Sequence, residues 1–329
     1  MKRPALLLTL SALVALLFCI SLLIGPAGFG IGESITALIR GEGEAVTLVM
    51  REIRLPRAVL AMMVGVSLGL SGAALQGFLR NPLAEPGLIG VSSSAALGAV
   101  IALQTGFAAS FALALPVSAL TGALVSVLLL LLLAGSRGGS LTLILAGIAI
   151  SALAGAFLSL VLNLSPNPFA VSEIVFWMLG SVSDRSFDHV AIALPVMAVG
   201  WALLASLGRG LDALTLGQDA ASAMGIHLAR LRLRLVIGVA ASVGAATAVA
   251  GAIGFVGLVV PHILRPFVGA RPAALLPASA LGGAAMVLAA DIAVRLILPD
   301  RDLKLGVVMA IIGAPLFLHL IYKTRRQMT

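Results

Sequence analysis

Residues 111–134 read FALALPVSALTGALVSVLLLLLLA, a run of 24 residues without one charged side chain. A helix of about 20 apolar residues crosses the ~30 Å hydrocarbon core of a bilayer. The rest of the chain has the same character: of 329 residues, 60% are hydrophobic and 10% are charged, and the mean hydropathy is +1.16. A soluble domain is roughly 45–50% apolar and about 25% charged. The composition therefore excludes a soluble fold and indicates a polytopic membrane protein.

Apolar runs between charged or Pro/Gly-rich breaks predict an all-α fold of about ten transmembrane helices, in a single membrane domain over residues 1–329. We expect the first run to be an uncleaved helix, because it lacks a convincing small-residue cleavage site. Residues 254–266 are short and begin in Gly254-Phe-Val-Gly257, which favours a half-inserted or broken helix. The ten predicted ranges are 5–24, 57–78, 87–104, 111–134, 141–163, 189–207, 235–252, 254–266, 273–296 and 305–322.

The basic residues predict the orientation of the chain. With both termini in the cytoplasm, 13 of the 21 Lys and Arg residues lie inside, together with three of the 13 acidic residues. An excess of Lys and Arg on the cytoplasmic side is the pattern that membrane insertion follows. The formal net charge of +8 is therefore explained by topology, and we expect no nucleic-acid partner.

Small residues four positions apart predict close packing between helices, because helices in lipid associate through close backbone approach. Three pairs have this spacing: Gly65 and Gly69, Ser151 and Gly155, Gly238 and Ser242.

Catalytic motifs are missing from the sequence. A phosphate-binding loop ends in Gly-Lys-Ser/Thr, but none of the three lysines follows a glycine. The four histidines lack the His-Glu-x-x-His spacing of a metalloprotease, so we expect neither a metal site nor a catalytic site. We expect no cofactor in this chain, and any ATP hydrolysis must come from another one.

Ionisable residues are nearly absent from the predicted spans, which argues against an ion-coupled carrier. Asp291 and Arg295 are the exception; they lie four residues apart near an outer helix end. Two interpretations stay open for this pair, a structural ion pair and a role for Arg295 in docking a partner. A secondary carrier that works without an ATPase remains the alternative function.

Three polar segments are candidates for contact with other proteins. Arg54-Leu-Pro-Arg57 places two arginines at the outer mouth of the second helix, where they either anchor the interface or bind carboxylates of a partner. Residues 80–87, RNPLAEPG, form a stiff inner turn. The long inner connection 208–234 contains about two helical turns between Gly217 and Gly225, which suit either a protein groove or the anionic lipid surface.

Several ordered motifs resemble the permease family of iron-siderophore, haem and vitamin B12 importers, over about residues 50–322. The matching motifs are Arg54-Leu-Pro-Arg57, Ser71-Gly-Ala-Ala-Leu-Gln76, RNPLAEPGLIG at 80–90, Trp177-Met-Leu-Gly-Ser181, GAIGFVGLVVPHILR at 251–265, Asp291 with Arg295, and Gly313-Ala-Pro-Leu-Phe317. The resemblance implies a ten-helix subunit of a type II ABC importer in the bacterial inner membrane.

The resemblance also implies partners and site residues. Two permease copies would form the path through the membrane lipid, two ATPase subunits would bind ATP and Mg²⁺ below it, and a periplasmic binding protein would deliver a metal chelate. The implied binding-protein docking residues are Arg54, Arg57 and Arg295. The implied cytoplasmic gate residues are Asn81, Pro82, Leu83, Ser140 and Leu141. The implied ATPase-coupling residues are Gly217, Gln218, Asp219, Ala220, Ala221 and Gly225.

One motif departs from the family pattern. Before the last helix the family has Glu-Leu-Pro-x-Gly, whereas this chain reads Asp302-Leu-Lys304-Leu-Gly306. Lysine in place of proline puts the local geometry of the outer mouth in doubt. The expected cargo is a ferric siderophore, with cobalamin and haem as alternatives.

Overall fold

The computed structural model describes residues 3–25, 27–111, 113–135, 139–297 and 303–328. Helices and turns account for the secondary structure of this described part, and it contains no strand. The α-helices are α1 (Arg3–Leu23), α2 (Ile31–Arg40), α3 (Glu44–Leu48), α4 (Leu55–Leu79), α5 (Val91–Gln104), α6 (Ala114–Ala134), α7 (Ser140–Asn163), α8 (Pro168–Met178), α9 (Phe187–Ala205), α10 (Gly208–Leu214), α11 (Gln218–Ala223), α12 (Leu228–Ala250), α13 (Val256–Leu264), α14 (Pro272–Ile297) and α15 (Leu305–Met328). Shorter turns are η1 (Val49–Arg54), η2 (Pro86–Ile89), η3 (Phe107–Ala109) and η4 (Arg265–Val268).

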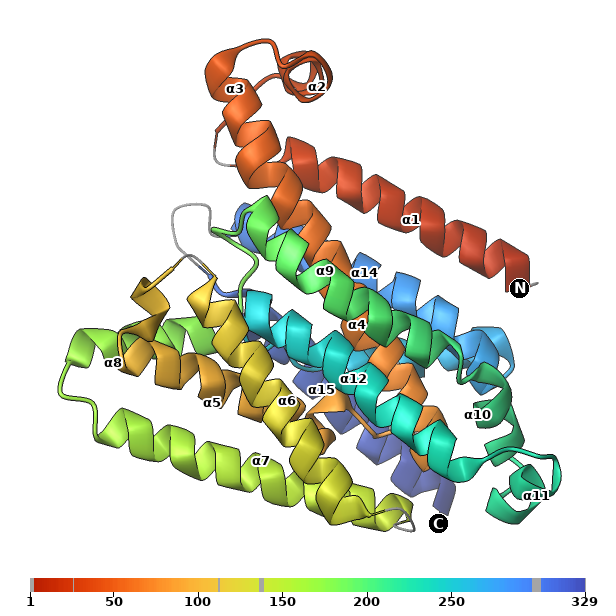
Figure 1. Ribbon diagram of the computed structural model, residues 1–329. Coiled ribbons are helices and arrows are strands. Elements are labelled where there is room, and N and C mark those ends of the chain that lie inside the picture. The colour runs from red at the N-terminus through yellow and green to blue at the C-terminus, as the bar shows by residue number, and fades with distance from the viewer. Residues whose placement is uncertain (1–2, 26, 112, 136–138, 298–302, 329) are drawn as a thin grey trace.

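Seven helical segments of the described chain are long and apolar enough to cross a membrane. They comprise α1, the continuous run from Glu44 to Leu79, α6, α7, α9, α12 and α14. Shorter apolar helices are α5, α8, α13 with η4, and the stretch Leu305–Leu318 of α15. Figure 1 shows these helices packed in one bundle, with α2 and α3 at one end and α10 and α11 at the other.

Each of the ten predicted ranges overlaps one helix of the structure, so the all-helical membrane fold is confirmed. The number of spans and the side of the termini stay predictions. Three helices were not predicted: α2, α8 and α10. The second predicted helix is also longer than expected, because α3 and η1 continue it without a break from Glu44.

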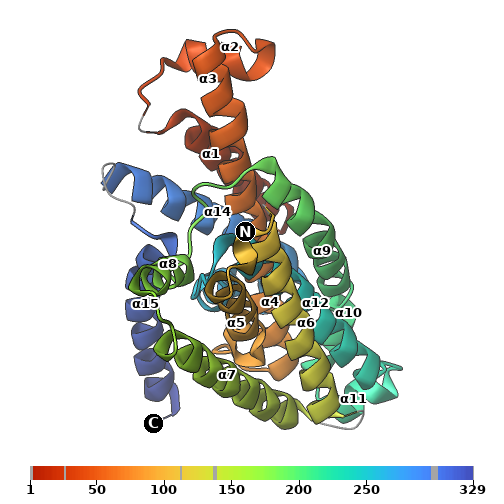
Figure 2. The ribbon, with the colours of Figure 1, turned by 60° about the vertical axis from the view of Figure 1, so that its left-hand side comes forward.

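The core of the bundle consists of α4 and α12. In the most apolar 18 residues of each span, 83% are buried in the run that contains α4 and 78% in α12. The buried share is only 28% in α1, 22% in α7 and 28% in α9. The central helices are rich in Gly, Ala and Ser, which lets neighbouring backbones approach closely. The outer helices instead expose Leu, Ile and Phe, as lipid-facing surfaces do. In Figure 2, α4 and α12 lie within the bundle and α7 runs along its edge.

The small-residue pairs predicted from spacing behave differently from one another. A Cβ atom at Gly65 or Gly69 of α4 would meet the backbone of Gly283 and Ser279 in α14, so these two helices touch backbone to backbone. Gly238 and Ser242 of α12 likewise contact Gly200 of α9. A Cβ atom at Gly155 of α7 would meet open space, so the pair Ser151 and Gly155 makes no such contact.

The range 254–266 holds a short helix after a non-helical break, and its half-insertion stays a prediction. Helix α12 ends at Ala250, residues 251–255 are non-helical, and α13 has only nine residues. Both ends of the break have positive φ, +71° at Gly251 and +68° at Phe255. Left-handed backbone is costly for a bulky side chain such as Phe255, and it persists only where the surroundings enforce it.

Candidate functional site

A buried ion cluster around Asp291 joins the N-terminal end of α4 to the C-terminal end of α14, at the end of the bundle that the sequence predicts to face outward. The Asp291 carboxylate accepts hydrogen bonds from Arg57 Nε at 2.9 Å and from Arg295 Nη2 at 2.7 Å, and Arg57 Nη2 lies 2.8 Å from Oδ1. The Asp291 side chain is 1% exposed. A buried carboxylate is tolerated only where it is paired and hydrogen-bonded. The predicted structural pair of Asp291 with Arg295 is therefore confirmed, and Arg57 is its third member.

Arg54 and Arg295 also cap the outer end of α1. Arg54 Nη1 donates to the carbonyls of Leu22 and Leu23 at 3.1 and 3.0 Å. Arg295 Nη1 donates to the carbonyls of Ser21 and Ile24 at 2.8 and 2.6 Å. The last carbonyls of a helix have no hydrogen-bond partner within the helix. A positive charge near this end is stabilised by the negative end of the helix dipole. The two arginines therefore fix the end of α1 to α4 and α14.

These contacts limit how the three predicted docking arginines can meet another protein. Arg54 is 4% exposed, and the side chains of Arg295 and Arg57 are 6% and 17% exposed. The guanidinium groups of all three already bind partners inside the molecule. Of the three, Arg57 is the most accessible. The docking role stays a prediction, and it now requires that a partner's carboxylates reach arginines that already have partners.

The predicted turn between α4 and α5 is present and is non-helical from Asn81 to Glu85. Arg80 ends α4 with a φ of +50°, and Asn81 Oδ1 accepts a hydrogen bond from the Leu83 amide at 2.9 Å. The turn then enters η2, which packs against α7. Burial raises the pKa of the Glu85 carboxyl in this turn above its ordinary value. No hydrogen bond or ion pair to that carboxyl occurs among the described residues.

The predicted gate residues do not all come together in this structure. Backbone atoms of Leu88 and Ile89 in η2 lie against Gly147 of α7, and Gly90 packs on Ile150. Ser140 and Leu141, the other predicted gate residues, form the start of α7, and Leu141 is 69% exposed. The turn therefore meets α7 about two helical turns after these residues, and the gate stays a prediction.

The short helix predicted between Gly217 and Gly225 is present as α11. Both glycines have positive φ, +107° and +82°, which only glycine adopts readily. Gln218 and Asp219 are exposed, as are Ser222 and Ala223 at the other end of the helix. Ala221, however, is fully buried. Ala221 therefore packs inside the molecule, and the ATPase-coupling role of the segment stays a prediction.

An ion pair fastens the neighbouring helix α10 to α14. Asp212 of α10 accepts from Arg271 Nη2 at 3.1 Å and from the Ala273 amide at 2.9 Å. The aspartate thereby caps the first turn of α14 in the way an N-cap side chain does. This contact links the segment that carries α11 to a long helix of the core.

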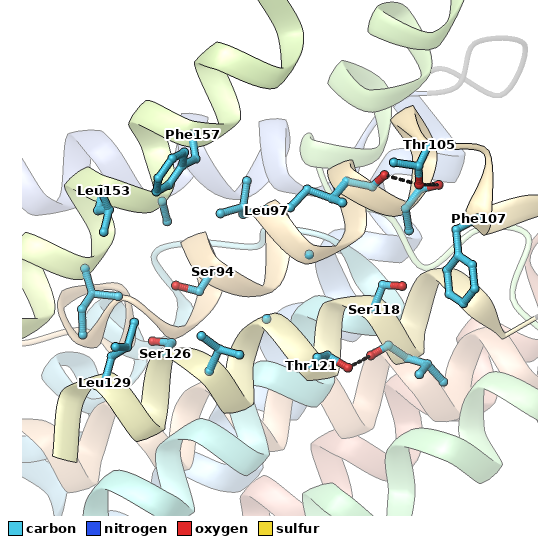
Figure 3. Close-up of a pocket in the computed structure, with 18 residues that line it drawn as sticks. Ser94, Leu97, Thr105, Phe107, Ser118, Thr121, Ser126, Leu129, Leu153 and Phe157 are labelled. Carbon is cyan, nitrogen blue, oxygen red and sulfur yellow. Dashed lines mark hydrogen bonds between the residues drawn. The ribbon is translucent and has the colours of Figure 1, made fainter. Parts of the chain in front are cut away.

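A cleft with a volume of about 650 Å³ lies between α5, α6 and α7 (Figure 3). Its wall is apolar, with Leu97, Leu129 and Phe157 among the side chains that line it. The hydroxyl of Thr121 is bonded to the Val117 carbonyl of its own helix and offers the cleft little polarity. None of the predicted site residues lines this cleft.

The sequence interpretation missed two sets of contacts in this cluster. The first is the ion pair of Arg57 with Asp291, and the second is the bonds of the arginines to the carbonyls of α1. The sequence carried no signal for Arg57, because Arg295, four residues away, already supplied Asp291 with a cationic partner. No cluster of three or more His, Cys, Asp or Glu residues that would hold a metal occurs in the described chain.

Comparisons with known proteins agree with this architecture. The model of the FecCD transport family matches residues 13–323. A Bacillus subtilis relative, the uncharacterised ABC transporter permease protein YvrB, is 39% identical over 285 residues, covering 85% of this chain and 80% of its own. The vitamin B12 import system permease protein BtuC of Vibrio cholerae is 40% identical over 274 residues, covering 83% and 82%.

Among solved structures, a metal-chelate type ABC transporter in an inward-facing conformation superposes with a TM-score of 0.87. The two sequences are 33% identical, and the match covers 97% of this chain and 99% of the other.

Proposed function

The chain belongs to the FecCD transport family, and from this we propose that it is one of two permease copies in an importer that carries a metal chelate from the periplasm to the cytoplasm. It is a multi-pass inner-membrane protein and the permease component of an ABC importer. ATP hydrolysis belongs to a separate subunit. The observation that carries the proposal is the structural match to a metal-chelate type transporter over nearly the whole chain.

Energy would reach the membrane through α11. The helix lies at the end of the bundle that holds α10, and its exposed residues Gln218, Asp219 and Ser222 suit a shallow groove in an ATPase subunit. The Asp212 contact to Arg271 and the Ala273 amide would pass a displacement of this segment to α14. The inner turn at Asn81, Pro82 and Leu83 would open and close the path together with the start of α7.

A periplasmic binding protein would dock at the outer ends of α4 and α14. Arg57 supports this proposal best, because it is the most exposed member of the Asp291 cluster. Receptor binding to the reconstituted permease across a salt series tests it. We expect Arg57→Glu to slow association at low salt, since charge reversal turns attraction into repulsion. Association of Arg57→Glu at the wild-type rate would refute docking at this residue.

Two cargo classes are in competition. A ferric siderophore is the cargo expected at the sequence level, whereas the Vibrio cholerae relative carries the name of a vitamin B12 permease, which favours cobalamin. Uptake of radiolabelled cobalamin and of a ⁵⁵Fe-loaded siderophore by the complete system separates the two. Haem is the third candidate and is measured in the same way.

Co-expression with the ATPase subunit of the same importer tests the subunit assignment. A complex of two permease and two ATPase chains in native mass spectrometry is the expected result. A permease that purifies without the ATPase, and that transports without it, would favour the ion-coupled carrier instead.

A further inference from the structure

A small cleft lies where the first turns of α1 and α14 meet, at the end of the bundle that holds α10. Its volume is about 180 Å³, and Leu6, Leu7 and Pro277 are among the apolar side chains that line it. Two arginines, Arg3 and Arg271, line the same cleft. The cleft therefore combines two positive charges with an apolar floor, and it lies apart from the outer Asp291 cluster and from α11.

The charges at the cleft are not balanced. Arg271 pairs with Asp212 at 3.1 Å, but its side chain is 65% exposed, so part of the guanidinium remains accessible. Arg3 is exposed and has no acidic partner within ion-pair distance among the described residues. Two guanidinium groups and one carboxylate leave a net charge of +1, which complements one phosphate diester.

The position of the cleft favours a lipid over a soluble anion. Helix α1 packs mainly on α14 and α4, and exposes Leu8, Leu13 and Leu16, so its outer face meets the acyl chains of the bilayer. The cleft opens beside the first turn of this helix, where the headgroup region of one leaflet begins. Basic pockets between transmembrane helices on the cytoplasmic side are known to hold anionic headgroups.

We propose that Arg3 and Arg271 bind the phosphate of one anionic phospholipid, whose first acyl methylenes pack on Leu6, Leu7 and Pro277. With the predicted topology this lipid comes from the inner leaflet. The lipid phosphate and Asp212 then share Arg271, so the bound lipid adjoins the ion pair that fastens α10 to α14. An anionic lipid would thus tie α1 to the segment that carries α11.

Native mass spectrometry of the purified chain tests this site, with phosphatidylglycerol and phosphatidylcholine offered at equal concentration. We expect the wild type to retain one phosphatidylglycerol preferentially. Arg3→Gln and Arg271→Gln should each lower this retention about fivefold, the equivalent of ~1 kcal/mol for one basic residue near a lipid surface. Arg3→Lys keeps the charge and should retain the lipid.

Arg230→Gln and Arg234→Gln are matched controls, because both residues are exposed on α12 and neither lines the cleft. Both controls should keep the wild-type preference. An unchanged preference in the Arg3→Gln, Arg271→Gln double variant, or an equal loss in the controls, would overturn the proposal. Displacement of the lipid by inorganic phosphate alone would also overturn it, since the acyl chain would then contribute nothing. These experiments measure lipid binding and not transport, so their result is independent of the importer proposal.

Discussion

At the scale of single residues, Asp291 explains how a charged group is retained near the outer end of a membrane helix. It is 1% exposed and lies between Arg57 and Arg295. The partner four residues away was predictable from helical spacing. The partner 234 residues away was not, because nothing in the sequence states that α4 and α14 are neighbours.

Removing this carboxylate should destabilise the protein strongly. In Asp291→Asn two buried guanidinium groups lose their counter-charge, and breaking a buried pair costs about 3–5 kcal/mol. We expect a clear fall in Tm, measured by thermal unfolding in detergent. Glu42→Gln is the control, because the Glu42 pair with Arg40 is exposed at both side chains and contributes little. Equal Tm values for Asp291→Asn and the wild type would contradict the assignment.

Glu85 predicts a dependence of stability on pH. Its pKa is raised by burial, so the folded state binds the proton more tightly than the unfolded state does. The stability that this group contributes is complete below its unfolded pKa, about 4.3, and is lost as pH rises through the folded pKa. Glu85→Gln should therefore be more stable than the wild type at pH 7, and the difference should shrink as the pH falls. A difference that stays constant with pH would exclude Glu85 as its source.

At the scale of elements, the crossing of α4 and α14 depends on glycine. A side chain at Gly69 would meet backbone atoms of Ser279 and Gly283, which cannot rotate away. Gly69→Leu should destabilise the fold by ~1–3 kcal/mol, the usual cost of overpacking. Gly155→Leu on α7 is the matched control, because its side chain would enter open space. A Tm for Gly69→Leu that equals that of Gly155→Leu would mean that the helices separate at no cost.

The exposed side of α11 provides a second test at this scale. Ala223→Trp places a large side chain on the free surface of the helix, where it should block the ATPase sterically while membrane insertion continues. Co-purification of the ATPase should fall sharply. Ser206→Trp, at an exposed position after α9, should leave it unchanged. Normal co-purification and normal uptake with Ala223→Trp would favour the lipid-surface interpretation of α11.

The sequence predicted the long helices better than the short ones. Apolar runs of about 20 residues have one stable arrangement in a membrane, so the long helices could be found by composition alone. In α2, with sequence IGESITALIR, polar residues interrupt the apolar ones, and the run is too short to cross a bilayer. The burial of Ala221 was also beyond the sequence, because the face that a two-turn helix turns inward depends on its neighbours.

At the scale of the whole molecule, the two ends of the bundle, predicted to be outer and inner, have different chemistry. The outer end holds arginines that are buried and bonded to Asp291 and α1. The inner end holds exposed basic residues, the turn with Glu85, and the helix α11. The roles that the motifs imply for these segments stay predictions, and the motifs did not predict that the outer arginines were already occupied, because capping of α1 depends on tertiary contacts.

The most direct test of the importer account is uptake into proteoliposomes that contain the permease, with the ATPase inside and the chelate-loaded binding protein outside. The account predicts uptake that requires both ATP and the ATPase and is insensitive to the collapse of ion gradients. Uptake driven by a proton or sodium gradient in liposomes that contain this chain alone would contradict it.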